Sequence, residues 1–331
     1  MNTTVTTVTG TLNLSDMGVT LTHEHLWMDT TRIYFKSYGE EKMSDEKITR
    51  ENRAQIVKDL HTIVFGYKDN IIFNDVDLMA EELSCFKEAG GQTLFEVSTL
   101  DLGRDPLRLQ EISRRTGINI VMGGTFYYYP SIDPEIQQLI EAKGAPALAD
   151  LMIREFYEGV GDTGIRPGVL GELGLQHGPT NEILAEAALI AQKETHAPLI
   201  VHSAPYWILD MAERIGADME KIVMGHWTAD DPVKEAIDRG AWVSFDQFGM
   251  NFPGIIGDDR RIEDVMSVFE RGLSHHLLLS QDTCWKVRLR HFGGDGYAHL
   301  LTDILPRLQE KGIPKQALDR IMIDNPAKLL A

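Results

Sequence analysis

The stretch RPGVLGELGLQHG, residues 166–178, ends a short apolar run with a carboxylate. Glu172 follows Val169 and Leu170, and Gly171 directly precedes it. A carboxylate at the end of a buried strand costs several kcal/mol unless another group pairs with it or a cation binds it. We therefore expect a strand that ends at Glu172, at a place where other polar groups or a cation reach the carboxylate.

The same unit, a short apolar run beside a longer amphipathic segment, recurs along almost the whole chain. Eight such strands begin near residues 18, 92, 118, 167, 199, 222, 241 and 276. Eight strand–helix units predict an α/β fold, a (β/α)8 TIM barrel, as a single domain over residues 1–331. A doubly wound sheet is the alternative, but the chain has neither a G-x-G-x-x-G turn after the first strand nor a Walker A sequence. The first 15 or so residues, rich in Thr and Val, predict a short hairpin or a plug before the barrel.

The composition excludes several classes of protein. The net charge of −18 disfavours binding to nucleic acid or to an anionic membrane surface. The chain lacks a run of about 18 apolar residues, so we expect no membrane span. The N-terminus lacks the pattern of a signal peptide, and Cys85 and Cys284 do not suggest a disulfide framework. These features predict a cytoplasmic protein.

Polar side chains gather where the predicted strands end, which is the catalytic face of a barrel. They are His23, His25, Glu172, His202, His226 and Asp282, and they include four of the 11 histidines. Each residue alone has an ordinary alternative: a histidine that bonds a loop, an aspartate that caps a helix, a glutamate that pairs with a lysine. Together they favour a site for divalent metal, with zinc, manganese, iron or cobalt as candidates. Six ligands suit two ions, and the two oxygens of Glu172 suit a position between them.

These motifs resemble those of a known family. The order THEH, GE, VHS, GH and SQD, with STLDLGRDPLRL, IDRGAWVSFD and GGDGYAHLL, is similar to the phosphotriesterase family of the amidohydrolase superfamily. The resemblance implies a binuclear metal hydrolase on a barrel, often a homodimer. The best-known members bridge their metals with a carboxylated lysine, so Glu172 places this chain with the glutamate-bridged branch, the phosphotriesterase homology and phosphotriesterase-related proteins. It also implies that His23, His25 and Asp282 hold one metal, that His202 and His226 hold the other, and that zinc is the first choice.

The implied chemistry is attack by a hydroxide that bridges the metals, with Asp282 as the residue that accepts its proton. Tyr127 matches a tyrosine that lies near the metals in family lactonases, and forming an aromatic pocket wall is its alternative role. The histidine that relays protons in the best-known enzyme is replaced by Gln247, which cannot relay one. A proton route beyond Asp282 is therefore not expected from this position.

The segment after Asp282 is locally basic, which is unusual in so acidic a chain. Lys286 and Arg288 are therefore candidates to bind an anionic group of a small-molecule substrate, and pairing with nearby acidic residues is the alternative. Three functions follow from the sequence. The first is hydrolysis of a carboxylic ester or lactone, the second is hydrolysis of an N-acyl amino compound or a phosphotriester, and the third is non-catalytic binding of a small molecule.

Overall fold

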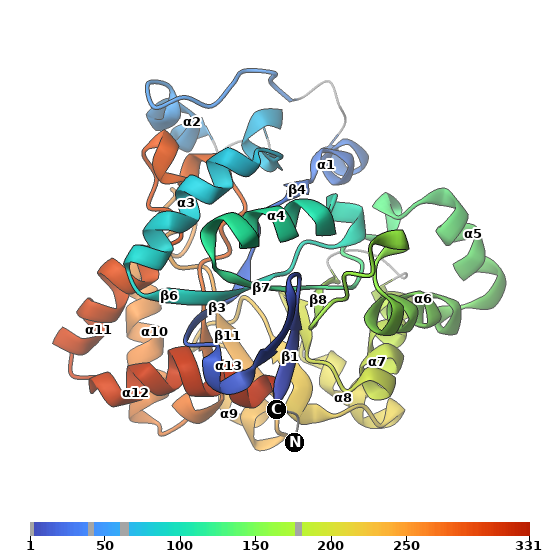
Figure 1. Cartoon of the computed structure of the whole chain (residues 1–331). Coiled ribbons are helices and arrows are strands. Elements are labelled where there is room, and N and C mark those ends of the chain that lie inside the picture. The colour runs from blue at the N-terminus through green and yellow to red at the C-terminus, as the bar shows by residue number, and fades with distance from the viewer. Residues whose placement is uncertain (1–2, 39–42, 60–65, 176–180) are drawn as a thin grey trace.

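The structure is a computed structural model that describes residues 3–38, 43–59, 66–175 and 181–331. Within these residues eight parallel strands surround a common axis in chain order (Figure 1). They are β3 (Val19–Glu24), β6 (Gly91–Glu96), β7 (Asn119–Met122), β8 (Leu170–Gly174), β9 (Leu199–His202), β10 (Ile222–Met224), β11 (Trp242–Phe245) and β12 (Leu277–Leu279). A bridge between Gly123 and Val169 joins the ladder β3–β6–β7 to the ladder β8–β12. The predicted (β/α)8 barrel is confirmed.

Helices pack around the outside of the barrel and bury their apolar faces against the strands. The main ones are α3 (Val76–Glu88), α4 (Pro106–Thr116), α5 (Pro134–Lys143), α6 (Ala145–Glu158), α7 (Asn181–Thr195), α8 (Trp207–Ile215), α9 (Val233–Asp238), α10 (Asp258–Glu270) and α11 (Leu305–Glu310). Helix α4 shows how local signals set the ends: the Asp105 carboxylate accepts the N–H groups of Leu107 and Arg108, and Gly117 ends the helix in the left-handed region. Among the described residues, every helix is too short or too polar to cross a membrane.

The two ends of the chain close the N-terminal end of the barrel. Strands β1 (Thr4–Thr7) and β2 (Gly10–Asn13) pair as an antiparallel hairpin, which confirms the predicted extension. Val5 of this hairpin and Leu329 of α13 (Asn325–Leu330) belong to one buried cluster with strand residues that include Ile200 and Leu278. Figure 1 shows both termini at this end. The interior is therefore a packed core, and the opposite end is left for chemistry.

Side chains hold the seam between the first and last strands. Ser280, just after β12, accepts the N–H of His23 at 3.0 Å and donates to the Glu24 carboxylate at 2.7 Å. The same carboxylate accepts the backbone N–H groups of Gln281 at 2.8 Å and Thr283 at 3.0 Å. Glu24 is completely buried. This one side chain thus joins the ends of two strands that each carry predicted site residues.

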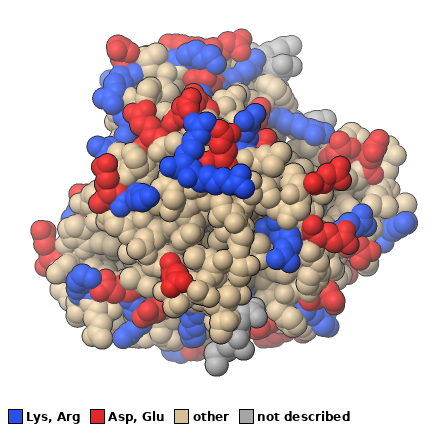
Figure 2. Space-filling model, viewed as in Figure 1, with Lys and Arg blue, Asp and Glu red and all other residues tan. Residues whose placement is uncertain are grey.

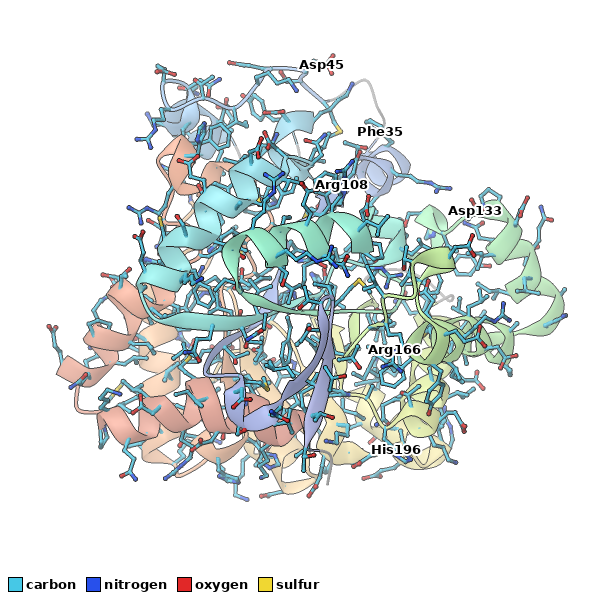
Figure 3. The ribbon with its side chains drawn as sticks, in the orientation of Figure 1. Phe35, Asp45, Arg108, Asp133, Arg166 and His196 are labelled. Carbon is cyan, nitrogen blue, oxygen red and sulfur yellow. The ribbon has the colours of Figure 1, made fainter. Side chains whose placement is uncertain are left out.

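An insertion between β3 and α3 lies on the side of the barrel opposite the termini (Figure 1). It contains β4 (Met28–Asp29), α1 (Thr31–Tyr38), α2 (Arg53–Asp59) and β5 (Ile72–Phe73), none of which the sequence analysis predicted. Phe35 of α1, labelled in Figure 3, lies with its ring centre 5.7 Å from the Lys68 ammonium. The apolar residues of this insertion pack against Met250 and Trp285 from the loops after β11 and β12. The insertion therefore forms part of the wall around the mouth of the barrel.

The surface mixes charges of both signs. On the face in Figure 2, basic and acidic side chains are interspersed. Arg115, for example, pairs with both Asp77 and Glu111. Exposed pairs of this kind contribute little to stability, usually about 0–1 kcal/mol.

We expect Glu24→Ala to lower the free energy of unfolding by roughly 3 kcal/mol, because it leaves the buried backbone N–H groups of Gln281 and Thr283 without an acceptor. Urea unfolding followed by circular dichroism measures this change. Glu310→Ala, at an exposed position, is the matched control and should stay within about 0.5 kcal/mol of wild type. Equal midpoints for the two variants would show that the seam does not depend on Glu24.

Candidate active site

The six residues predicted from strand ends come together at the C-terminal mouth of the barrel. Glu172 is the centre of the group: its Oε2 lies 3.2 Å from His23 Nε2 and 4.0 Å from His202 Nε2. Its Oε1 lies 3.5 Å from His25 Nε2. The carboxylate therefore faces imidazoles from two sides, and both of its oxygens are engaged with different histidines.

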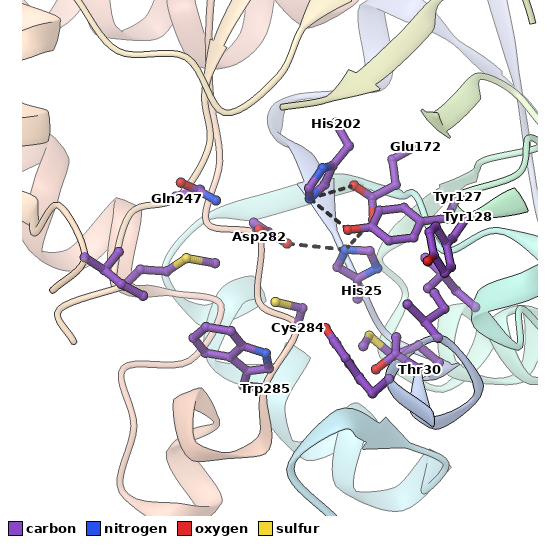
Figure 4. A pocket seen from close by; sticks show the side chains of 16 residues that line it. His25, Thr30, Tyr127, Tyr128, Glu172, His202, Gln247, Asp282, Cys284 and Trp285 are labelled. Atoms are coloured by element: carbon purple, nitrogen blue, oxygen red, sulfur yellow. Dashed lines mark hydrogen bonds and ion pairs between the residues drawn. The ribbon is translucent and has the colours of Figure 1, made fainter. Parts of the chain in front are cut away.

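Asp282 lies on the opposite side of the same group. Its Oδ1 is 3.3 Å from His25 Nε2 and its Oδ2 is 3.7 Å from His226 Nε2. Asp282 is also 3.9 Å from His23 Nε2. Figure 4 shows His25, Glu172, His202 and Asp282 converging on one point.

Two of these residues have backbone conformations that residues other than glycine rarely adopt. His226 has a φ of 60° and Asp282 a φ of 49°. Each such residue costs of order 1 kcal/mol and persists only where its surroundings hold it. The N–H of His226 donates to Asp246 at 3.0 Å, and the N–H of Asp282 donates to the carbonyl of His23 at 3.1 Å. The strained turns aim both side chains at the centre of the site.

A carboxylate behind the site contacts two of the histidines. Asp246, directly after β11, is completely buried, and its Oδ1 lies 2.7 Å from His226 Nδ1. Its Oδ2 lies 3.2 Å from His23 Nδ1. The Nε2 atoms of both rings are thereby directed toward the centre of the site. The sequence analysis missed Asp246, although it also lies at a strand end.

A second buried pair supports His25 in the same way. Ser98 Oγ lies 2.9 Å from His25 Nδ1 and donates to Glu96 Oε1 at 2.6 Å. Because the hydroxyl proton goes to the carboxylate, Ser98 accepts from His25, which fixes the proton on Nδ1. Glu96 ends β6, so the rule that selects polar strand ends would also have found it.

The surroundings set the protonation of these groups. Burial lowers the pKa of His202 to about 3, with the neighbouring His226 acting in the same direction, so this imidazole is neutral near pH 7. Burial also disfavours protonated His23, but Asp246 and Glu172 outweigh it and raise its pKa well above the usual value. For Asp282 burial acts upward, yet His25 and His226 hold its pKa below the usual range. The carboxylates are therefore ionised, and protons reside on some of the histidines.

The polar atoms of the site fit divalent metal ions. His23 Nε2, His226 Nε2 and Glu172 Oε2 are buried and form no aligned hydrogen bond. Leaving such groups without partners is costly, and a cation would satisfy all three. One set of ligand atoms, from His23, His25 and Asp282, lies within 4.8 Å of one another, and so does a set from His23, Glu172 and His226. Imidazole nitrogen with carboxylate oxygen is the donor set that zinc and manganese accept.

A pocket of about 250 Å³ opens onto these groups. Four of the six predicted ligands line its floor, namely His25, Glu172, His202 and Asp282. Its walls are mostly apolar or aromatic, formed by Met28, Ile33, Tyr34, Leu102, Tyr127, Tyr128, Met250, Ile255 and Trp285. The polar wall residues are Thr30, Gln247 and Cys284. The shape suits a small molecule with one polar group at the floor and an apolar portion above it.

Tyr127 is in the pocket, where the sequence analysis placed it. Its hydroxyl lies 3.1 Å from His202 Nε2, and burial raises its pKa well above the usual value, so it stays protonated. The backbone of Tyr127 lies close to β8 only because residue 174 is a glycine: a Cβ added there would lie 1.8 Å from the Tyr127 carbonyl oxygen. The phenol is thus held at the floor as a possible hydrogen-bond donor.

Lys286 and Arg288 do not reach the pocket. Lys286 Nζ pairs with the buried Asp69 of the insertion at 3.0 Å. The Arg288 guanidinium donates to the carbonyls of Gln281 at 2.5 Å, Asp282 at 2.7 Å and Phe248 at 2.5 Å. Both cations therefore have buried partners that hold the loops in place, which is close to the alternative that the sequence analysis considered.

Comparison with known proteins agrees with this geometry. The model of the phosphotriesterase family matches residues 3–330. The chain belongs to the phosphotriesterase family. Proteins named N-acetyltaurine hydrolase from Mus musculus and Homo sapiens are similar to it, at 33% and 31% identity, with 98% of this chain and 97% of each relative covered. A phosphotriesterase-related protein from Nematostella vectensis is 32% identical over 97% of this chain and 96% of its own length.

Two solved structures have the same fold. A resiniferatoxin-binding protein from Rhodobacter sphaeroides is 31% identical, has a TM-score of 0.89, and is matched over 99% of this chain and 95% of its own. A phosphotriesterase homology protein from Escherichia coli, complexed with phosphate in its active site, superimposes with a TM-score of 0.78 at 24% identity, over 96% of this chain and 99% of its own. Both likenesses support the barrel as the scaffold of the site.

We expect Asp246→Asn to weaken zinc binding by about 10- to 100-fold, because it removes the carboxylate that contacts both His23 and His226. Competition with a chromogenic chelator measures the affinity. Asp238→Asn, at an exposed position of α9, should leave the affinity unchanged. Equal affinity in the two variants would contradict a supporting role for Asp246.

Zinc uptake should release protons. His23, His25 and His226 all have raised pKa values in the metal-free protein, and a ligating imidazole must be neutral. We therefore expect roughly one to three protons released per chain at pH 7, and weaker zinc binding as the pH falls. Calorimetric titration in two buffers of different ionisation enthalpy counts these protons. A titration without proton release would show that the histidines are already neutral.

Proposed function

We propose that this protein is a metal-dependent hydrolase that cleaves the amide bond of a small N-acyl amino compound. One observation carries the hydrolase assignment: four imidazoles and two carboxylates converge at the C-terminal mouth of the barrel, and four of these six groups line the floor of a pocket of about 250 Å³. Several of their buried ligand atoms have no aligned hydrogen bond. A cluster of this kind is expensive to maintain without a cation and without a reaction to perform.

In the proposal, His23, His25 and Asp282 would hold one divalent ion and His202 and His226 a second, with the Glu172 carboxylate available to both. When bound, two such ions lower the pKa of a water molecule toward neutrality and polarise the carbonyl of the substrate. The protein orients the side chains that would hold these ions. Asp246 and Ser98 set the direction of three of the imidazoles, and the apolar walls exclude bulk water.

Asp282 is the residue proposed to move the proton. Its carboxylate is ionised and lines the pocket, so it can accept the proton of the attacking water. An amine leaves an amide only after its nitrogen is protonated, and Asp282 would deliver that proton. Gln247, at the end of the neighbouring strand, cannot accept one. The proton is therefore expected to pass between water, Asp282 and the leaving nitrogen alone.

The relatives support an amide in preference to the ester or lactone that the sequence analysis placed first. Several similar proteins, at 28–33% identity, are named N-acetyltaurine hydrolase, an amide-cleaving activity. Ester or lactone hydrolysis is the second candidate, supported by the Tyr127 hydroxyl at the floor of the pocket. Zinc as the metal, a homodimer and a cytoplasmic location stay predictions from the sequence.

The test is a panel assay on zinc- or manganese-loaded protein. We expect turnover of N-acetyltaurine or N-acetyl-β-alanine to exceed that of a γ-lactone, an aryl ester and an aryl phosphotriester. Asp282→Asn should lower kcat by at least about 100-fold, since it removes the general acid–base, and its metal content should be measured in parallel because Asp282 is also a proposed ligand.

The other outcomes are equally informative. Turnover of the lactone or ester without the amides would move the assignment to the second candidate. Wild-type protein that binds metal and turns over none of the four classes would reject both bond types. Protein that binds no metal would overturn the metal-dependent assignment itself.

A further inference from the structure

Gln247 is a polar residue in the pocket wall that the proposed mechanism does not use. It follows Asp246 at the end of β11 and lines the same pocket as Asp282 and His202. Its Oε1 accepts a hydrogen bond from Arg261 Nη2 at 3.2 Å. Its amide nitrogen has no partner among the described residues.

Arg261 decides which way the Gln247 amide faces. A guanidinium only donates hydrogen bonds, so the atom that meets it must be the amide oxygen. The nitrogen is then directed away from Arg261. Figure 4 shows this nitrogen on the side of the histidines and Asp282, with the oxygen on the far side. The pocket wall therefore presents an N–H donor at this position.

Arg261 also places positive charge behind that donor. It lies on α10 with 3% of its surface exposed, and within the described residues it forms no ion pair. Its Nε is buried without a hydrogen bond. The carboxylates of Asp246, Asp258 and Asp264 act on Arg261 electrostatically. The hydrogen bond nevertheless brings the guanidinium into direct contact with the Gln247 amide and polarises it, because the local dielectric is low. The Gln247 amide is thus a stronger donor than an isolated amide would be.

The loop that carries Gln247 is fixed in position. Asp258 accepts the N–H of Gly249 at 2.7 Å, and its other oxygen accepts from Asn251 at 2.7 Å and lies 2.7 Å from His299 Nε2. Asp258 and Arg261 lie one turn apart at the start of α10. The same helix therefore anchors both the loop and the side chain.

Resting on the proposed function, we propose that Gln247 is a specificity-determining residue whose amide nitrogen, oriented by Arg261, binds an anionic oxygen, carboxylate or sulfonate, on the amino portion of the substrate. Among the described residues that line the pocket, none is a lysine or an arginine. Lys286 and Arg288 are held by other partners. Gln247 is the polar wall residue with positive charge directly behind it, and it would replace these cations in recognising the anion.

The test compares an anionic substrate, N-acetyl-β-alanine, with its neutral analogue N-acetylpropylamine. In Gln247→Glu the side chain keeps an oxygen for Arg261 but replaces the donor by a second oxygen. We expect kcat/KM for N-acetyl-β-alanine to fall about 10- to 100-fold, mainly through KM, as for the loss of a hydrogen bond to a charged group. The value for N-acetylpropylamine should change less than about threefold. Gln247→Met, which removes both polar atoms, should also lower kcat/KM for N-acetyl-β-alanine.

Gln316→Glu, the same substitution at an exposed position of α12 (Lys315–Asp319), is the matched control and should leave both substrates unaffected. A purely structural role for Gln247 predicts the opposite pattern. Gln247→Glu would then retain wild-type preference because the contact with Arg261 is kept. An unchanged preference in an active enzyme would overturn the inference and leave the proposed function standing.

Binding distinguishes failure of the inference from failure of the proposed function. Calorimetry on Asp282→Asn would measure the Kd of N-acetyl-β-alanine, with and without Gln247→Met. If wild type hydrolyses no amide, but Asp282→Asn binds this probe and the second substitution weakens binding at least about tenfold, Gln247 recognises the anion although the proposed function is wrong. Equal binding by the two variants would overturn the inference.

Discussion

The need to satisfy buried charge at one end of a barrel governs this structure. Carboxylates and imidazoles from six strand ends lie within a few ångströms of one another, where burial alone would drive each toward its neutral form. Their mutual contacts counter that tendency: Asp246 and Asp282 stay ionised because histidines surround them. The strained turns at His226 and Asp282 and the Glu24 seam all serve to hold these groups together. A cation is the natural complement to what remains unsatisfied.

The site has two layers with different tasks. The inner layer presents ligand atoms to the site, and the outer layer, made of Asp246, Ser98 and Glu96, fixes which nitrogen of His23, His25 and His226 faces inward. Gln247 and Arg261 repeat this arrangement in the pocket wall, since a buried group orients an accessible one. At the floor and at the wall of the pocket, a buried side chain thus orients the side chain that faces the substrate. Both the proposed chemistry and the proposed recognition depend on residues that contact no substrate.

Much of this architecture could be predicted from the sequence, because parallel strands buried on both faces appear as short apolar runs and their ends converge on one face. Glu172, His202 and Asp282 were found in this way. The insertion with α1 and α2 was not predicted, because it packs on distant loops through Met250 and Trp285. The orientation of the Lys286 and Arg288 side chains could not be predicted from the sequence either. Whether a cation faces a pocket or a buried carbonyl depends on tertiary partners, and Asp69 lies more than 200 residues away from Lys286 in the chain.

The Arg288 guanidinium donates to the carbonyls of Phe248, Gln281 and Asp282 and so joins the bases of the loops after β11 and β12. Arg288 fixes the part of each loop that is next to its strand. Insertions or substitutions farther along the loops, at their tips, would therefore alter the pocket wall without displacing Asp282. The tips can therefore diverge while the reactive centre is kept. A library randomised at the tips with Arg288 retained would therefore be a rational starting point for engineering a new substrate range.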